Sequence, residues 1–119
     1  MKKVAIALQQ EFVSSRKLTP QFAEFYNLFK REFTKMLKEN FDIAEIRIRR
    51  GHFYVSGFFQ LTDGSIFHFH LGDVRWDCFG DGKKLLIKTA NSFEDYVSGN
   101  YNFVDVDDIE KIKQIVLSS

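Results

Sequence analysis

FYVSGFFQLTDGSIFHFHL, residues 53–71, holds two runs of β-prone side chains on either side of a turn signal. Two loops could join the runs. A two-residue Asp63-Gly64 turn would mix apolar and polar side chains on both faces. A three-residue Thr62-Asp63-Gly64 loop, with Gly64 in the left-handed bulge position, pairs Phe59 with Phe67 and separates the faces. The second register is therefore the prediction, and it makes this stretch an antiparallel hairpin.

This register gives the hairpin an apolar inner face and a mixed outer face. The inner positions are Phe53, Val55, Gly57, Phe59, Leu61, Phe67, Phe69 and Leu71, and the outer ones are Tyr54, Ser56, Phe58, Gln60, Ile66, His68 and His70. Upstream, a two-residue Arg50-Gly51 turn pairs Ile48 with Phe53 and adds a strand over residues 43–49. Arg47 and Arg49 of that strand then join the outer face.

Downstream of the hairpin, residues 84–90 predict a fourth strand. Leu85 and Ile87 alternate with Lys84 and Lys88, so the leucine and isoleucine face the core and the lysines face outward. The segment after this strand predicts a single helical turn that ends at Gly99, followed by loop.

Helical periodicity occupies both ends of the chain. Apolar residues recur from Phe22 to Leu37 behind a Thr19 cap and Pro20, and a shorter run predicts a first helix that ends near residue 16. A C-terminal helix has Asp107 as its expected cap and Glu110 in the capping-box position. The predicted fold is α+β, with two N-terminal helices and one C-terminal helix packed on one face of a four-stranded antiparallel sheet.

Composition limits the class of protein. The 119 residues fit a single domain, residues 1–119, and 45% hydrophobic content is enough for a packed core. A net charge of +1 removes any global attraction to nucleic acid. The single cysteine, Cys78, favours a reducing cytoplasm, and no run approaches the roughly 20 apolar residues that span a bilayer. We therefore expect a cytoplasmic protein that does not act in a membrane.

The two histidines His68 and His70 raise the question of a metal site. Side chains two residues apart on a strand project to one face about 7 Å apart, which suits two zinc ligands. His52 is a poor third ligand, because it is roughly 13 Å of strand away in the predicted register. Asp73, Asp77 or Cys78 could reach in from the following loop, but nothing in their spacing requires it. Their alternation with core phenylalanines favours surface histidines, which would gain charge below about pH 6.5.

No other motif predicts catalysis or a cofactor. Cys78 lacks a local nucleophile signature, and Asp107-Asp108 is explained by the start of a helix. The run Gly80-Asp81-Gly82-Lys83 lacks the spacing of a phosphate-binding loop. We therefore expect no enzyme activity, no cofactor and no resident metal.

The predicted outer face collects cations and rings against one acid, Glu45. Its residues are Arg47, Arg49, His52, Tyr54, Phe58, His68, His70, Lys84 and Lys88. Cations beside exposed rings suit either a protein partner or single-stranded nucleic acid. A solvated face, or one covered by the long loop over residues 72–82, is the plainer reading. That loop holds Arg75 and Trp76, which would be either an interface anchor or a plug at the sheet edge.

The stretches GHFYVSGFFQLTDGSIFHFHLGDVRW and LLIKTANSFEDYVSGNYNF resemble small proteins of unassigned function carried by phages and conjugative elements, over about half of the chain. Small accessory proteins of such elements include inhibitors of host defence nucleases, among them anti-CRISPR proteins. The resemblance implies a non-catalytic inhibitor that binds a host protein or ribonucleoprotein. Direct binding of single-stranded nucleic acid and a metal-dependent hydrolase are the alternatives, and a homodimer through a sheet edge or the outer face is possible.

Overall fold

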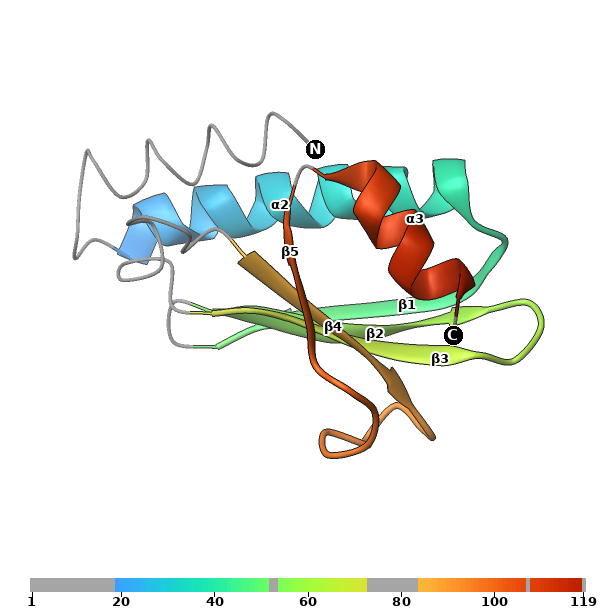
Figure 1. Ribbon diagram of the computed structural model, residues 1–119. Helices are drawn as coiled ribbons and strands as arrows, with labels where there is room; N and C mark the ends of the chain where they lie inside the picture. Colours follow the sequence, from blue (N-terminus) through green and yellow to red (C-terminus); the bar gives the residue numbers. More distant parts are fainter. Residues whose placement is uncertain (1–18, 52–53, 73–83, 107, 119) are drawn as a thin grey trace.

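The structure, a computed structural model, describes residues 19–51, 54–72, 84–106 and 108–118 (Figure 1). Its centre is an antiparallel sheet whose five strands neighbour one another in chain order. The strands are β1 (Ile43–Arg50), β2 (Val55–Leu61), β3 (Ile66–Leu71), β4 (Lys84–Ala90) and β5 (Asn102–Asp105). Helices α2 (Thr19–Asn40) and α3 (Ile109–Leu117) lie on one side of this sheet. The predicted α+β class with an antiparallel sheet is confirmed.

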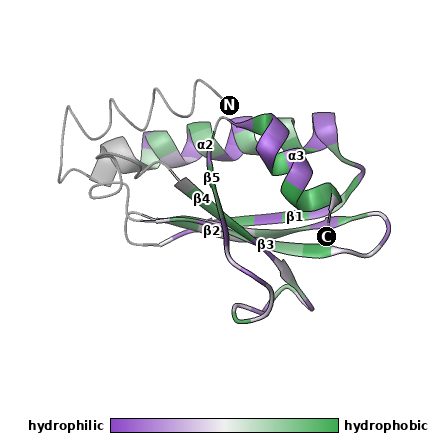
Figure 2. Cartoon of the chain, in the orientation of Figure 1, coloured by the Kyte–Doolittle hydropathy of each residue, from purple (hydrophilic) through white to green (hydrophobic). Residues whose placement is uncertain are grey.

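The core lies between the helices and the inner face of the sheet. The helical stripe of α2 contributes its buried residues Phe25, Phe29, Phe33, Met36 and Leu37. Phe33 meets Phe69 of β3 with 4.7 Å between ring centroids, and Phe59 stacks on Phe67 at 5.2 Å. Figure 2 shows hydrophilic and hydrophobic bands along both helices, as expected where one face of each helix covers the sheet.

The β2–β3 hairpin has the three-residue loop that the alternation of side chains favoured. Phe59 pairs with Phe67, the Leu61 amide donates to the Ser65 carbonyl at 2.9 Å, and Gly64 has a φ of 94°. This φ lies in the left-handed region, where a glycine carries no Cβ penalty. The predicted register of this hairpin is confirmed.

The pairing of β1 with β2 differs from the prediction by four residues. Ile48 pairs with Gly57 instead of Phe53, and the connection runs from Gly51 to Tyr54, where the Gly51 amide donates to the Tyr54 carbonyl at 2.9 Å. Gly57 suits the position, because a Cβ there would stand 2.9 Å from the Phe69 ring. Since the displacement is an even number of residues, Ile46, Ile48, Arg47 and Arg49 keep their predicted faces. A register shift between Ile43 and Glu45 breaks the alternation at the start of the strand.

The prediction of four strands was wrong, because residues 102–105 form β5. Val104 pairs with Leu85 and is buried in the core. Four residues are too few to give a clear alternation, and the pairing with β4 is decided by tertiary contact. The residues between β4 and β5 form turns in place of the expected helical turn.

The helix predictions have mixed outcomes. α2 includes Thr19, which was expected to be its cap, whereas the first predicted helix lies outside the described residues. The cap of α3 is Asp108, whose carboxylate accepts from the Lys111 amide at 3.2 Å. The predicted cap Asp107 was therefore one residue early, and Asp107 itself lies outside the described residues.

Candidate functional site: the outer sheet face

Residues 91–101 connect β4 to β5 and lie against the outer face of the sheet, opposite the helices (Figure 1). We call this segment the cover. Phe93 and Tyr96 of the cover meet Phe58 of β2, with 6.0 and 5.2 Å between ring centroids. The sequence analysis considered a covering loop over residues 72–82, but residues 73–83 lie outside the described part of the chain. The cover that the structure describes is a different segment.

Asp95 holds the cover in shape. Its carboxylate accepts hydrogen bonds from the backbone amides of Asn91, Val97 and Ser98, at 2.9, 3.1 and 3.0 Å. Hydrogen bonds from the Ser98 side chain and from the Asn91, Ser98 and Val97 amides favour the charged form, so the pKa of Asp95 lies well below its ordinary value. The Asp95 carboxylate therefore links three backbone amides of the cover and fixes its conformation.

Gly99 brings the cover back against β4. Its φ of 82° lies in the left-handed region. A Cβ at this position would stand 2.6 Å from Thr89 Oγ1 and 2.9 Å from the Thr89 amide nitrogen. Both observations require a glycine here, and they show that the cover packs closely against Thr89 of β4.

The cover buries three residues that the sequence analysis placed on an exposed face. Phe58, His68 and Lys88 keep 3%, 5% and 2% of their surface exposed. Their side chains do point to the outer face, as the alternation predicted, but the prediction that they are exposed was wrong. The cause is their contact with the cover, which the alternation of side chains within one strand cannot reveal.

Lys88 contacts the middle of the cover and its C-terminal end. Its Nζ donates to the Tyr96 carbonyl and lies 4.8 Å from the centroid of the Tyr101 ring. No carboxylate among the described residues forms an ion pair with it. A carbonyl dipole and the negative face of a ring therefore compensate a buried ammonium, whose desolvation would otherwise cost several kcal/mol.

His68 is a buried base beside other cations. Its Nδ1 lies 3.0 Å from the Gly57 carbonyl, so Nδ1 carries the proton of the neutral ring, because a carbonyl only accepts. Burial lowers the pKa of His68, and the charges of Lys88, His70 and Arg49 add to that effect against the opposing Gly57 hydrogen bond. His68 should therefore gain its charge at a lower pH than the value of about 6.5 expected from the sequence.

Arg47 and Arg49 pack against the rings of the cover. The Arg47 guanidinium lies 4.4 Å from the Phe93 ring centroid, and its Nε donates to the Glu45 carboxylate. The Arg49 guanidinium lies 5.2 Å from the Tyr96 ring centroid and donates to the Tyr96 hydroxyl. The predicted meeting of cations and rings is thus present, but the rings come from a segment that was expected to form a helical turn and was not placed on this face.

Four apolar side chains of the cover and β5 face solvent, and we call them the contact patch. They are Tyr96, Val97, Tyr101 and Phe103, with 41%, 86%, 64% and 55% of their surface exposed. Tyr101 and Phe103 lie 6.4 Å apart between ring centroids, and Lys88 connects Tyr96 with Tyr101. This patch was not predicted from the sequence, although four aromatic residues within positions 93–103 were a signal for it.

The remaining predicted residues have separate outcomes. His70 lies beside Tyr54, with 5.3 Å between ring centroids, and 6.5 Å from His68 by the same measure. His52, Arg75, Trp76 and Cys78 lie outside the described residues, as does the side chain of Lys84. Within the described ranges, no group of three or more histidine, cysteine, aspartate or glutamate side chains could hold a metal ion.

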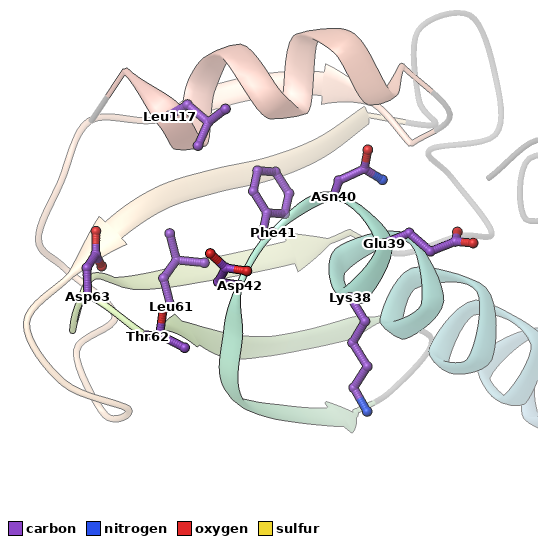
Figure 3. A pocket seen from close by; sticks show the side chains of 9 residues that line it. All are labelled: Lys38, Glu39, Asn40, Phe41, Asp42, Leu61, Thr62, Asp63 and Leu117. Carbon is purple, nitrogen blue, oxygen red and sulfur yellow. The ribbon is translucent and has the colours of Figure 1, made fainter.

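A hollow of about 400 Å³ lies elsewhere, where the end of α2, the β2–β3 loop and Leu117 of α3 approach one another (Figure 3). Figure 3 shows Lys38 and Glu39 pointing away from the other lining side chains. The Asp63 carboxylate accepts from the Ser65 amide at 2.9 Å, so its role is in the hairpin loop. These side chains do not converge on a common point, and the outer face remains the better candidate site.

No helix in the described part of the chain is long and apolar enough to cross a membrane. Comparison with protein-family models, with curated proteins and with solved structures finds no match to this chain.

Proposed function

We propose that this chain is a small, non-catalytic binding protein that contacts a partner protein in the cytoplasm through the contact patch. The observation that carries the proposal is the exposure of Tyr96, Val97, Tyr101 and Phe103 on a segment that is held in one shape. Exposed aromatic side chains on a rigid support are typical of interface hot spots, because little side-chain freedom is lost on binding.

A protein partner agrees better with the charges than nucleic acid does. Lys88 is buried under the cover, and Arg47 is already paired with Glu45. Few cations are then left to neutralise phosphates, which supply most of the affinity for a nucleic-acid strand. The contact patch is apolar at its centre with Arg49 at its border, as in a protein interface.

The kind of partner is suggested by the resemblance to small proteins of phages and conjugative elements. On that basis we propose a role for the mobile element, as an inhibitor of a host complex that handles nucleic acid or of a CRISPR-type defence complex. Inhibition would require only that the contact patch occlude a surface of the host complex, with no chemical step.

The experiment is a pull-down from a bacterial lysate with the tagged full chain, with and without nuclease treatment. Val97→Ser and Phe103→Ser should each weaken capture of the partner by roughly tenfold. Leu117→Ser is the matched control, because Leu117 is 65% exposed but lies on α3, across the sheet from the contact patch. Equal losses in the control and the patch variants would refute the proposed surface.

Binding of single-stranded nucleic acid is the second candidate, favoured by the exposed rings of Tyr101 and Phe103, on which bases could stack. The double change Arg47→Glu with Arg49→Glu should then abolish salt-sensitive retardation of DNA or RNA. Capture that disappears on nuclease treatment would support this candidate over the first. A purified chain that retards no nucleic acid at low salt would exclude it.

A further inference from the structure

The free edge of β1 borders a groove on the side of α2. This edge groove has a volume of about 620 Å³ and is lined by Lys30, Thr34 and Lys38 of α2 and by residues 43–48 of β1. β1 is the first strand in the sheet order, so no described strand pairs with its other side. The groove is separate from the contact patch, which belongs to the cover and β5.

The backbone of β1 has groups that point into the edge groove. The Gly51 amide bonds to the Tyr54 carbonyl, and in an antiparallel pair such bonding alternates along the strand. Residues 45, 47 and 49 therefore direct their amides and carbonyls toward β2, and Ile46 and Ile48 direct theirs outward. The Tyr26 hydroxyl agrees with this phase, because it donates to the Ile48 carbonyl at 3.2 Å.

The side chains of β1 are also incompletely covered. Ile43, Ile46 and Ile48 pack against the core but stay only partly buried, unlike the core residues of β2, β3 and β4. An additional strand beside β1 would cover these isoleucines and pair the outward amides and carbonyls. The hydrogen bond from Tyr26 to Ile48 marks one end of the space available to it.

The charge of the edge groove selects among such strands. Lys30 and Lys38 are exposed on the same side of α2, and neither forms an ion pair with a described residue. Glu45, the one acid among the lining residues, is paired with Arg47. The groove therefore offers unpaired positive charge beside a strand edge.

From these observations we propose that the edge groove binds an extended acidic peptide segment of a partner protein, which adds to the sheet as a strand antiparallel to β1. Main-chain hydrogen bonds to residues 46 and 48 supply general affinity, and Lys30 and Lys38 select acidic side chains. The proposal does not depend on the function proposed for the contact patch.

The test uses the full chain and a fluorescein-labelled peptide of four Glu-Val repeats, followed by fluorescence anisotropy. The peptide should bind, and the corresponding Lys-Val peptide should not. The double change Lys30→Glu with Lys38→Glu should weaken binding by roughly tenfold or more, because two attractive charges become repulsive. The matched control is Arg31→Glu with Lys35→Glu, which alters two exposed cations of α2 that do not line the edge groove.

Methylation of peptide nitrogens separates strand addition from attraction of charge alone. A strand presents alternate amides to its neighbour, so N-methylation of every second residue should abolish binding in one phase and spare it in the other. Equal binding in both phases would overturn the proposal, as would an unchanged affinity of the Lys30/Lys38 variant. A chain that is dimeric by light scattering, with the Ile46 and Ile48 amides protected from exchange before peptide is added, would also overturn it.

Discussion

Replacement of Gly99 by alanine should detach the cover from β4. A left-handed φ costs a residue with a Cβ about 1–2 kcal/mol, and forcing a methyl group into a closely packed contact costs about 1–3 kcal/mol more. The second cost applies because the new Cβ would stand 2.6 Å from Thr89 Oγ1. We expect Gly99→Ala to weaken closure of the cover by about 2–5 kcal/mol, the sum of these two costs.

The measurements are amide exchange and histidine titration by NMR. Opening of the cover should accelerate exchange of the Val97 and Ser98 amides, which are bonded to Asp95 in the closed form. It should also expose His68, whose pKa should rise toward its ordinary value as the burial that lowers it is removed. One substitution should therefore produce two independent signals.

Gly64→Ala is the matched control for Gly99→Ala. Gly64 has a similar φ of 94°, but a Cβ there would meet nothing within 4 Å. The control should cost only the left-handed strain of about 1–2 kcal/mol and should leave the His68 titration unchanged. If Gly99→Ala costs no more than Gly64→Ala and His68 titrates as in the parent chain, the inferred contact between the cover and β4 is wrong.

The remaining predictions concern two titratable groups, His68 and Asp95. Because the pKa of His68 is lowered in the folded state, the unfolded chain binds a proton at this histidine first as the pH falls. The free energy of unfolding should therefore be highest above about pH 6.5 and decline below it. Urea unfolding of His68→Gln should show a smaller decline over the same pH range. Asp95 is an acid whose carboxyl pKa is lowered in the folded state. Its contribution to the stability of the folded state is therefore present above about pH 4 and lost as the pH falls below that value. Asp95→Asn should speed amide exchange at Val97 and Ser98 at neutral pH, and unchanged exchange would exclude the role given to this carboxylate.

The sequence predicts the layers of this fold well, because they depend on local alternation. The period of two along residues 53–71 assigned Phe59, Phe67 and Phe69 to the core, where all three are buried. Even the incorrect β1–β2 pairing kept Ile46, Ile48, Arg47 and Arg49 on their predicted faces, since only an odd displacement exchanges the faces.

The cover could not be predicted in the same way. Its position depends on Gly99 fitting against Thr89 and on Lys88 reaching the Tyr96 carbonyl, and neither contact leaves a periodic pattern. The aromatic residues of the segment were visible, but nothing local indicated which face of the sheet they would meet. The sequence therefore predicted which face of the sheet carries the candidate site and which cations lie on it. It did not predict the exposed apolar side chains of the contact patch.

The buried Lys88 has a consequence for how this protein can evolve. Its ammonium depends on the Tyr101 ring and on the backbone conformation at Tyr96, so we expect substitutions at these positions to be coupled. Loss of the ring should be tolerated only together with loss of the lysine. Lys35 of α2 is exposed, forms no ion pair with a described residue and does not line the edge groove, so it can be exchanged without such compensation. Related chains should therefore show coupled substitution across β4 and the cover, and independent substitution at Lys35.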